Sequence, residues 1–391
     1  MTSARSAWAG ATRSLLLTSM AIFVVTVVIG ILNGLDLVEF PRDQLLTHVH
    51  AGTLGWIALG IVASAFWLFG AADRRLGIAL AVLIPIYAAA FFSGNLTARA
   101  ITGTAVLIAI LWLLAWVWRS YLAGERSLPR LGVALGLTTF TYGAIIGVVL
   151  QIQFASGTTL LSGDAIGAHA GAMVFSFVVL SAMGLLEWRL RATADLPRGG
   201  VTQLAALFLG GLVLSVGLLV GAGQAAGGIY LLAELVAVAL FARRILPTAI
   251  RVPWGTNGPE RHIGAAAIWV IVGLLLFMYL IVLFIGAKGD VAAIPQGALI
   301  ASDHSVFIGV MTNLLIGLVA TFSADQAGRY RWANPLIFWG LNVGLAVFVV
   351  GLIAESAVIK RVGSPVMGLA ILLALAVLAA RTWSSRGPAE A

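Results

Sequence analysis

The sequence contains no cysteine, which excludes disulfides, iron–sulfur clusters, thiolate metal sites and covalent attachment of c-type heme. Charge is also scarce, because charged residues make up 10% of the chain, against roughly 25% in an average soluble domain. Polar stretches long enough to form a soluble domain are missing as well. Any redox cofactor must therefore be held by His, Met, Tyr or carboxylate side chains.

Hydrophobic residues make up 61% of the chain and occur in long runs. A helix needs about twenty apolar residues to cross ~30 Å of hydrocarbon. We therefore predict an all-α integral membrane protein with twelve transmembrane helices in one domain, residues 1–391, with short tails at 1–13 and 382–391. The predicted spans are 14–33, 48–70, 76–94, 99–118, 131–153, 165–188, 202–222, 226–245, 264–287, 299–322, 334–355 and 364–381.

The basic residues indicate the orientation. Of the 23 Lys and Arg residues, all but five fall in the segments on the side of the two termini. Basic residues accumulate on the cytoplasmic side of membrane proteins, so both termini are predicted to be cytoplasmic, in a bacterial-type inner membrane. The +8 net charge serves orientation in the bilayer and does not indicate nucleic-acid binding. The five outer residues are Arg42, Arg99, Lys288, Lys360 and Arg361.

Four of the five histidines lie near the outer ends of predicted spans two, six and ten: His48, His50, His169 and His304. These spans all run inward, so the four imidazoles are predicted at similar depth. His-Ala-Gly occurs at both His50 and His169. The equal spacing of these spans predicts three pseudo-repeated four-helix units. The fifth histidine, His262, falls in a predicted cytoplasmic loop and is interpreted as a surface residue.

An imidazole inside a membrane is costly unless it is paired or bound to a metal. One interpretation is that each histidine bonds a backbone carbonyl across helices. The other, which we favour, is that they bind heme iron or copper, since neutral imidazole is a common ligand for both. Gly52 and Gly55 follow His48 on the same helical face and would suit a flat macrocycle.

Twelve helices with histidines at the outer ends of helices two, six and ten resemble subunit I of the heme–copper oxidases and nitric oxide reductases. In that family, helices two and ten hold a low-spin heme and helix six supplies a copper ligand. Thr47-His48-Val49-His50 matches the helix-two position and His304 the helix-ten position, whereas His169 matches helix six by location only. The resemblance implies a b-type heme with His50 or His48 and His304 as axial ligands.

The resemblance is to a reduced member of that superfamily, similar to the NnrS-type or short subunit-I-like heme proteins. Span seven lacks the paired histidines of the family, and spans six and ten lack its fuller ligand motifs, so a proton-pumping dinuclear centre is not expected. His169 and the remaining helix-two histidine are predicted to hold a second metal, such as copper, or a second heme. Met173 is either a copper ligand or a packing residue. Three acidic residues either orient the imidazoles or lie in wet outer loops: Asp43, Asp164 and Asp303.

If the protein is an enzyme, the resemblance implies an oxidoreductase that acts on nitric oxide, oxygen or quinol, with a partner subunit or oligomer for electron entry. The alternatives are a heme- or copper-handling factor and a twelve-helix secondary transporter. The transporter interpretation depends on intramembrane polar residues, of which Glu234 is the strongest candidate. Glu187 is interpreted as interfacial. The other polar residues within spans are Gln151, Gln153, Asn313 and Asn342.

Overall fold

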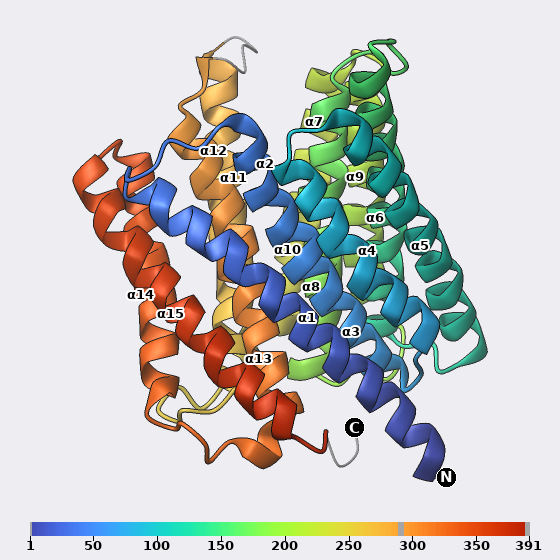
Figure 1. The fold of residues 1–391 in the computed structure, drawn as a ribbon, viewed down its shortest axis with the longest axis vertical. Helices are drawn as coiled ribbons and strands as arrows, with labels where there is room; N and C mark the ends of the chain where they lie inside the picture. The colour runs from blue at the N-terminus through green and yellow to red at the C-terminus, as the bar shows by residue number, and fades with distance from the viewer. Residues whose placement is uncertain (1, 288–292, 388–391) are drawn as a thin grey trace. The chain divides into compact units, whose positions relative to one another are not determined.

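The computed structural model describes residues 2–287 and 293–387, with side chains from residue 8 onward. Within these ranges, 12 helices are long and apolar enough to cross a membrane, and each coincides with a predicted span (Figure 1). The prediction of an all-α protein with twelve transmembrane helices is confirmed. Residues 2–13, predicted as a tail, instead form the start of the first helix. Lys288 and the last four residues of the predicted C-terminal tail lie outside the described residues.

Nine of these spans are single helices, and three are composite helices in which a π-helical segment joins two α-helical segments. The composite helices are α2 (Arg42–His50), η1 (Ala51–Ala58) and α3 (Leu59–Phe69); α7 (Ala165–Gly171), η2 (Ala172–Val178) and α8 (Val179–Leu190); and α12 (Gln296–His304), η4 (Ser305–Thr312) and α13 (Asn313–Phe322). The single helices are α1 (Thr2–Gly34), α4 (Arg74–Phe92), α5 (Leu96–Ala123), α6 (Leu128–Ser156), α9 (Arg198–Leu219), α10 (Gly223–Ala249), α11 (Glu260–Gly286), α14 (Ala333–Ile353) and α15 (Ala357–Ser384).

Helix starts are set by capping side chains, which satisfy backbone N–H groups that have no partner within the helix. Asp73 accepts hydrogen bonds from the N–H groups of Arg75 and Leu76 at the start of α4. Asn95 caps α5 in the same way, and Asp164 caps α7 by accepting from Gly167 N at 2.8 Å. These caps fix where the chain enters the membrane after each short connection.

The chain divides into two compact units. Unit 1 comprises Met1–Thr12 and Ser64–Pro247, and unit 2 comprises Arg13–Ala63 and Thr248–Ala391. In unit 1, α6 packs against α5, α7, η2 and α8, and α9 packs against α7. In unit 2, α14 and α15 lie side by side, and α11 packs against η4 and α13 (Figure 1). The organisation into one domain stays a prediction.

The ends of α1 and α15 are joined in unit 2 by ion pairs at the predicted outer side. Asp36 accepts from Lys360 Nζ at 2.8 Å and from Arg361 Nε at 3.0 Å. These two hydrogen bonds hold the pKa of the Asp36 carboxyl below its ordinary value. Lys360 and Arg361, predicted in a loop, lie in the first turns of α15.

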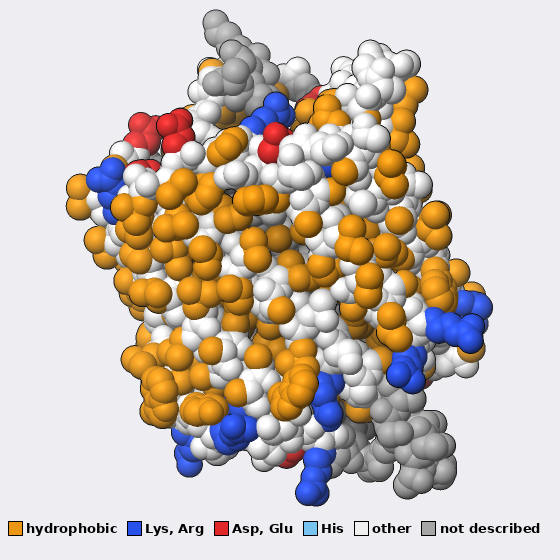
Figure 2. Space-filling view, viewed as in Figure 1, with side chains coloured by type: hydrophobic (Ala, Val, Ile, Leu, Met, Phe, Trp, Pro, Cys, Tyr) orange, Lys and Arg blue, Asp and Glu red, His pale blue; other side chains and the backbone are white. Residues whose placement is uncertain are grey.

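Hydrophobic side chains cover much of the surface in view in Figure 2. Many large apolar side chains are exposed along the helices, such as Ile101, Ile108 and Val282. A soluble protein would rarely expose so much contiguous apolar surface. This surface is the one expected of helices in contact with lipid.

Candidate functional site

The three composite helices are those that carry the four predicted site histidines. In their most apolar windows, 89%, 83% and 83% of the residues are buried, whereas no other described span exceeds 67%. A π-helical segment begins directly after His50 and after His304, and three residues after His169. π-helices are rare and occur often at functional sites. Their recurrence next to the histidines of helices two, six and ten supports the predicted pseudo-repeat and marks these positions as the candidate site.

His48 is held by Thr26 of the neighbouring helix α1. Its Nδ1 lies 2.8 Å from the Thr26 carbonyl oxygen, and Thr26 Oγ1 donates back to the His48 carbonyl at 3.3 Å. A carbonyl oxygen only accepts, so Nδ1 carries the proton and Nε2 carries the lone pair in the neutral ring. Gly30, one turn along α1, lets the ring approach, since a Cβ there would lie 2.9 Å from His48 Cε1.

His304 has the same tautomer, because its Nδ1 lies 2.9 Å from the carbonyl oxygen of Ile300, one turn earlier in α12. The ring of Phe348 from α14 lies beside it, at 5.1 Å between ring centroids. Among the described residues, no hydrogen bond to Nε2 of either His48 or His304 is found. Both rings therefore present a lone pair on Nε2.

The rings of His48 and His304 lie together within unit 2. Their centroids are 6.5 Å apart and their planes are inclined by 23°. An imidazole nitrogen binds a metal ion at ~2 Å, and the centre of the imidazole ring lies about 1 Å beyond that nitrogen. Two imidazoles on opposite sides of one ion therefore have ring centroids ~6 Å apart. The separation therefore fits a bis-histidine site for a single metal ion, such as the iron of a low-spin heme.

The structure selects between the two helix-two histidines. His48 faces His304, whereas His50 is two residues further along, and its Nδ1 lies 2.8 Å from the Leu46 carbonyl of its own helix. Two residues along an α-helix point to opposite sides. Of the two ligands left open by the sequence, His48 is the one that the structure brings to His304.

His169 repeats the construction of His48 within unit 1. Its Nδ1 lies 2.8 Å from the carbonyl oxygen of Gly143 in the preceding helix α6. Gly147, four residues after Gly143, again lies against the ring, since a Cβ there would be 2.7 Å from His169 Cε1. The helix before the histidine thus supplies a carbonyl and, one turn later, a glycine in both units. The predicted second metal or heme at His169 stays a prediction.

The structure shows the contacts of three further groups of residues that the sequence analysis considered beside the histidines. Gly52 and Gly55 do not border open space, because a Cβ at either would meet Thr26 or Ile22 of α1, so they serve helix packing. Asp164 caps α7, and the oriented nitrogen of each of the four histidines bonds a backbone carbonyl. Met173 packs at Gly143. Main-chain carbonyls therefore set the tautomers of His48, His169 and His304.

His262 is not the surface residue that was predicted, because it is only 5% exposed and lies in the first turn of α11. Its Nδ1 donates to Asn313 Oδ1 at 3.1 Å, because an amide oxygen only accepts. The orientation of the Asn313 amide is fixed by its Nδ2, which donates to Gly309 O and to Asn342 Oδ1. Asn342 Nδ2 donates back to Asn313 Oδ1 at 3.1 Å, and Trp269 Nε1 donates to Asn342 Oδ1. The result is a saturated carboxamide pair that ties α11, α13 and α14 together.

Glu187 lies in the last turn of α8, and its side chain is buried within the protein, with 1% of its surface exposed. Its Oε1 lies 2.8 Å from Arg244 Nη2, and the hydroxyl of Thr193 donates to the same oxygen. Arg244 also donates to Gln203 at 3.0 Å. This ion pair joins α8, α9 and α10 at the predicted cytoplasmic end of unit 1.

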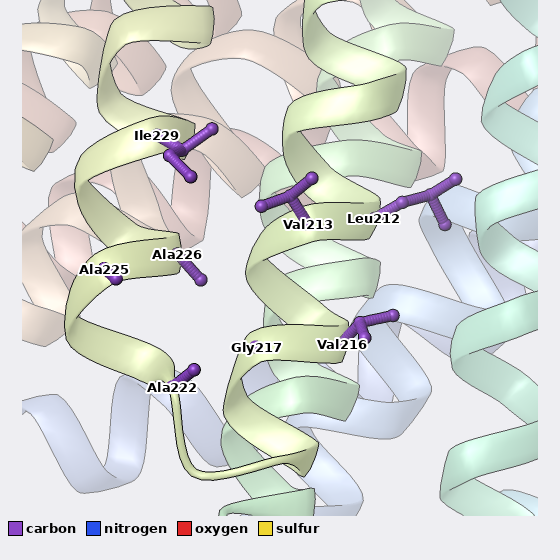
Figure 3. A pocket seen from close by; sticks show the side chains of 8 residues that line it. All are labelled: Leu212, Val213, Val216, Gly217, Ala222, Ala225, Ala226 and Ile229. Carbon is purple, nitrogen blue, oxygen red and sulfur yellow. The ribbon is translucent and has the colours of Figure 1, made fainter.

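An open groove of about 410 Å³ lies between α9 and α10 in unit 1 (Figure 3). Its lining is small and apolar, with Gly217, Ala222 and Ala226 among its residues. It contains no histidine and no charged side chain, so it offers a metal or heme iron no ligand. The candidate site remains the histidine pair of unit 2.

Within the described part of the chain, no cluster of three or more His, Cys, Asp or Glu side chains could hold a metal ion. A heme needs only one or two protein ligands, because the porphyrin supplies the other four, so the His48–His304 pair fits a heme better than a bare copper ion. Comparison of the chain with models of known protein families and with the curated proteins gives no match to either.

Proposed function

We propose that the protein is a b-type heme membrane protein, with His48 and His304 as the axial ligands. The observation that carries this proposal is the pairing of the two rings at 6.5 Å, each with Nδ1 held by a carbonyl and Nε2 left for a metal. Second-shell bonds of this kind orient ligating histidines and raise their basicity. A heme held by both histidines would have all six iron positions filled, so it would supply one-electron transfer.

The same proposal assigns the chain to an oxidoreductase related to heme–copper oxidase subunit I, with nitric oxide, oxygen or quinol as the substrate class. The distribution of arginines supports a cytoplasmic location for both termini. A partner subunit would deliver electrons. Copper at His169 would require further ligands beside that histidine. A heme-handling factor would use the same two ligands without turnover.

The second candidate function is proton-coupled transport, which one observation favours. Glu234 in α10 is 6% exposed, and its Oε2 has no hydrogen-bond partner. Ionisable residues inside a membrane often mark ion or proton paths. Transporter sites usually lie at broken helices. In the described part of the chain, the nearest equivalents are the π-helical segments, which lie beside the histidines and not beside Glu234. We therefore rank heme binding first.

Replacing Gly30 with Val tests the heme proposal without removing a ligand. The Val side chain must displace the His48 ring, so we expect heme affinity to fall about 10–100-fold, the range for loss of groups that orient metal ligands, and the heme content of the purified protein to fall with it. Heme is measured by pyridine hemochrome, and the elution volume in size-exclusion chromatography checks the fold.

Gly147→Val is the matched control, because it places the same steric load on His169 in unit 1. This variant is expected to keep the heme bound by His48 and His304. If Gly147→Val lost the heme and Gly30→Val retained it fully, the heme would be assigned to His169, and the assignment to His48 and His304 would be wrong.

A further inference from the structure

Glu234 lies in the membrane-spanning helix α10 and has no visible counter-charge. It is 11 residues from the start of α10 at Gly223, which places it ~17 Å along the helix, near the middle of the membrane. Its side chain is 6% exposed, and Oε2 is fully enclosed. No hydrogen bond or ion pair of this carboxyl group is found in the described part of the chain.

The elements packed against this part of α10 carry few charges. On α9, which approaches at Gly210 and Ala233, the only charged residue is Arg198 at its first position. The composite helix α7–η2–α8 carries His169, Glu187 and Arg189, and Glu187 is paired with Arg244. None of these groups bonds Glu234, so nothing here would stabilise a carboxylate.

A second buried group near α10 also has spare hydrogen-bonding capacity. Tyr230, one turn before Glu234, donates its hydroxyl to the Phe175 carbonyl of η2 at 3.0 Å. The next residue of η2, Ser176, is fully buried, and its hydroxyl has no partner. Two polar side chains on neighbouring elements are thus unsatisfied within the membrane interior of unit 1.

An isolated carboxylate in a low-dielectric interior costs several kcal/mol or more, and the group avoids this cost by binding a proton. We propose that Glu234 is a proton-binding site in the membrane interior of unit 1, and that it exchanges its proton with bulk water. This inference does not depend on the heme, since Glu234 belongs to unit 1 and the paired histidines to unit 2.

Infrared spectroscopy of the purified full-length protein tests this inference. At neutral pH we expect the carbonyl stretching band of a protonated carboxylic acid, which Glu234→Gln removes. Transfer to D₂O is expected to shift the band, because the proton exchanges. Asp303→Asn is the second variant, because Asp303 is also an acidic residue within a membrane-spanning helix, and any part of the band that it removes is assigned to Asp303 and not to Glu234.

Four outcomes would overturn the inference. The band could survive in Glu234→Gln, or disappear only in Asp303→Asn. It could remain unshifted after long incubation in D₂O, which would make Glu234 a permanently protonated structural group. It could vanish in sodium chloride but not in choline chloride at the same pH, which would make the ligand a sodium ion. Heme content, measured on the same samples, is expected to be unchanged in Glu234→Gln.

Discussion

His304→Ala is expected to reduce the heme content to background while the protein remains folded. The substitution removes one of the two imidazoles that the structure places 6.5 Å apart, and no other described histidine lies beside His48 to replace it. Reduced-minus-oxidised visible spectra would show loss of the low-spin signal, and His48→Ala is expected to give the same result. Added free imidazole should restore part of the absorbance by filling the space of the missing ring.

His50→Ala is the matched control, since its position is only two residues from His48. It is expected to retain heme, because His50 bonds its own helix and does not face His304. If His50→Ala lost the heme and His48→Ala kept it, the ligand assignment on helix two would be wrong, although the heme proposal itself would stand.

Arg244→Met is expected to destabilise the protein by ~3–5 kcal/mol, the range for breaking a buried ion pair on one side. The substitution removes the cation at 2.8 Å and leaves the buried Glu187 with the more exposed Arg191 at 3.8 Å, and it also removes a donor to Gln203. Thermal unfolding in detergent measures the loss.

The double variant Glu187→Met with Arg244→Met distinguishes the loss of the ion pair from the cost of leaving the Glu187 charge without Arg244. Replacement of both partners by apolar side chains is often neutral, so the double variant should recover most of the stability. Equal destabilisation of the single and double variants would show that packing, and not an unpaired charge, is responsible.

The spans could be predicted from the sequence because the bilayer dictates their length and apolar character. A similar depth for His48, His169 and His304 is predicted by the same argument and stays a prediction. The choice of His48 over His50 could not be predicted, since it depends on the rotation of α2 against α1. The π-helical segments leave no local signature, because the apolar residues of η1 and η4 resemble those of any span.

His262 was misplaced because the segment before it, which contains Pro253, Gly255 and Gly258, suggested a loop that continued to 263. Pro259 followed by Glu260 is a helix-start pattern, and attention to it would have placed His262 in a helix. The role of Gly52 and Gly55 was also misjudged. A glycine on a ligand's helical face can serve either a macrocycle or a neighbouring helix, and only tertiary contacts distinguish the two.

The central claim is that His48 and His304 hold a b-type heme, and the most direct test is the dithionite-reduced minus oxidised spectrum of the detergent-purified wild-type protein. It should be combined with a pyridine hemochrome assay and iron analysis on the same sample. A sharp α-band with stoichiometric iron and protoheme is the predicted result. A colourless protein without iron, purified from heme-replete cells, would contradict the claim and make transport through unit 1 the leading function.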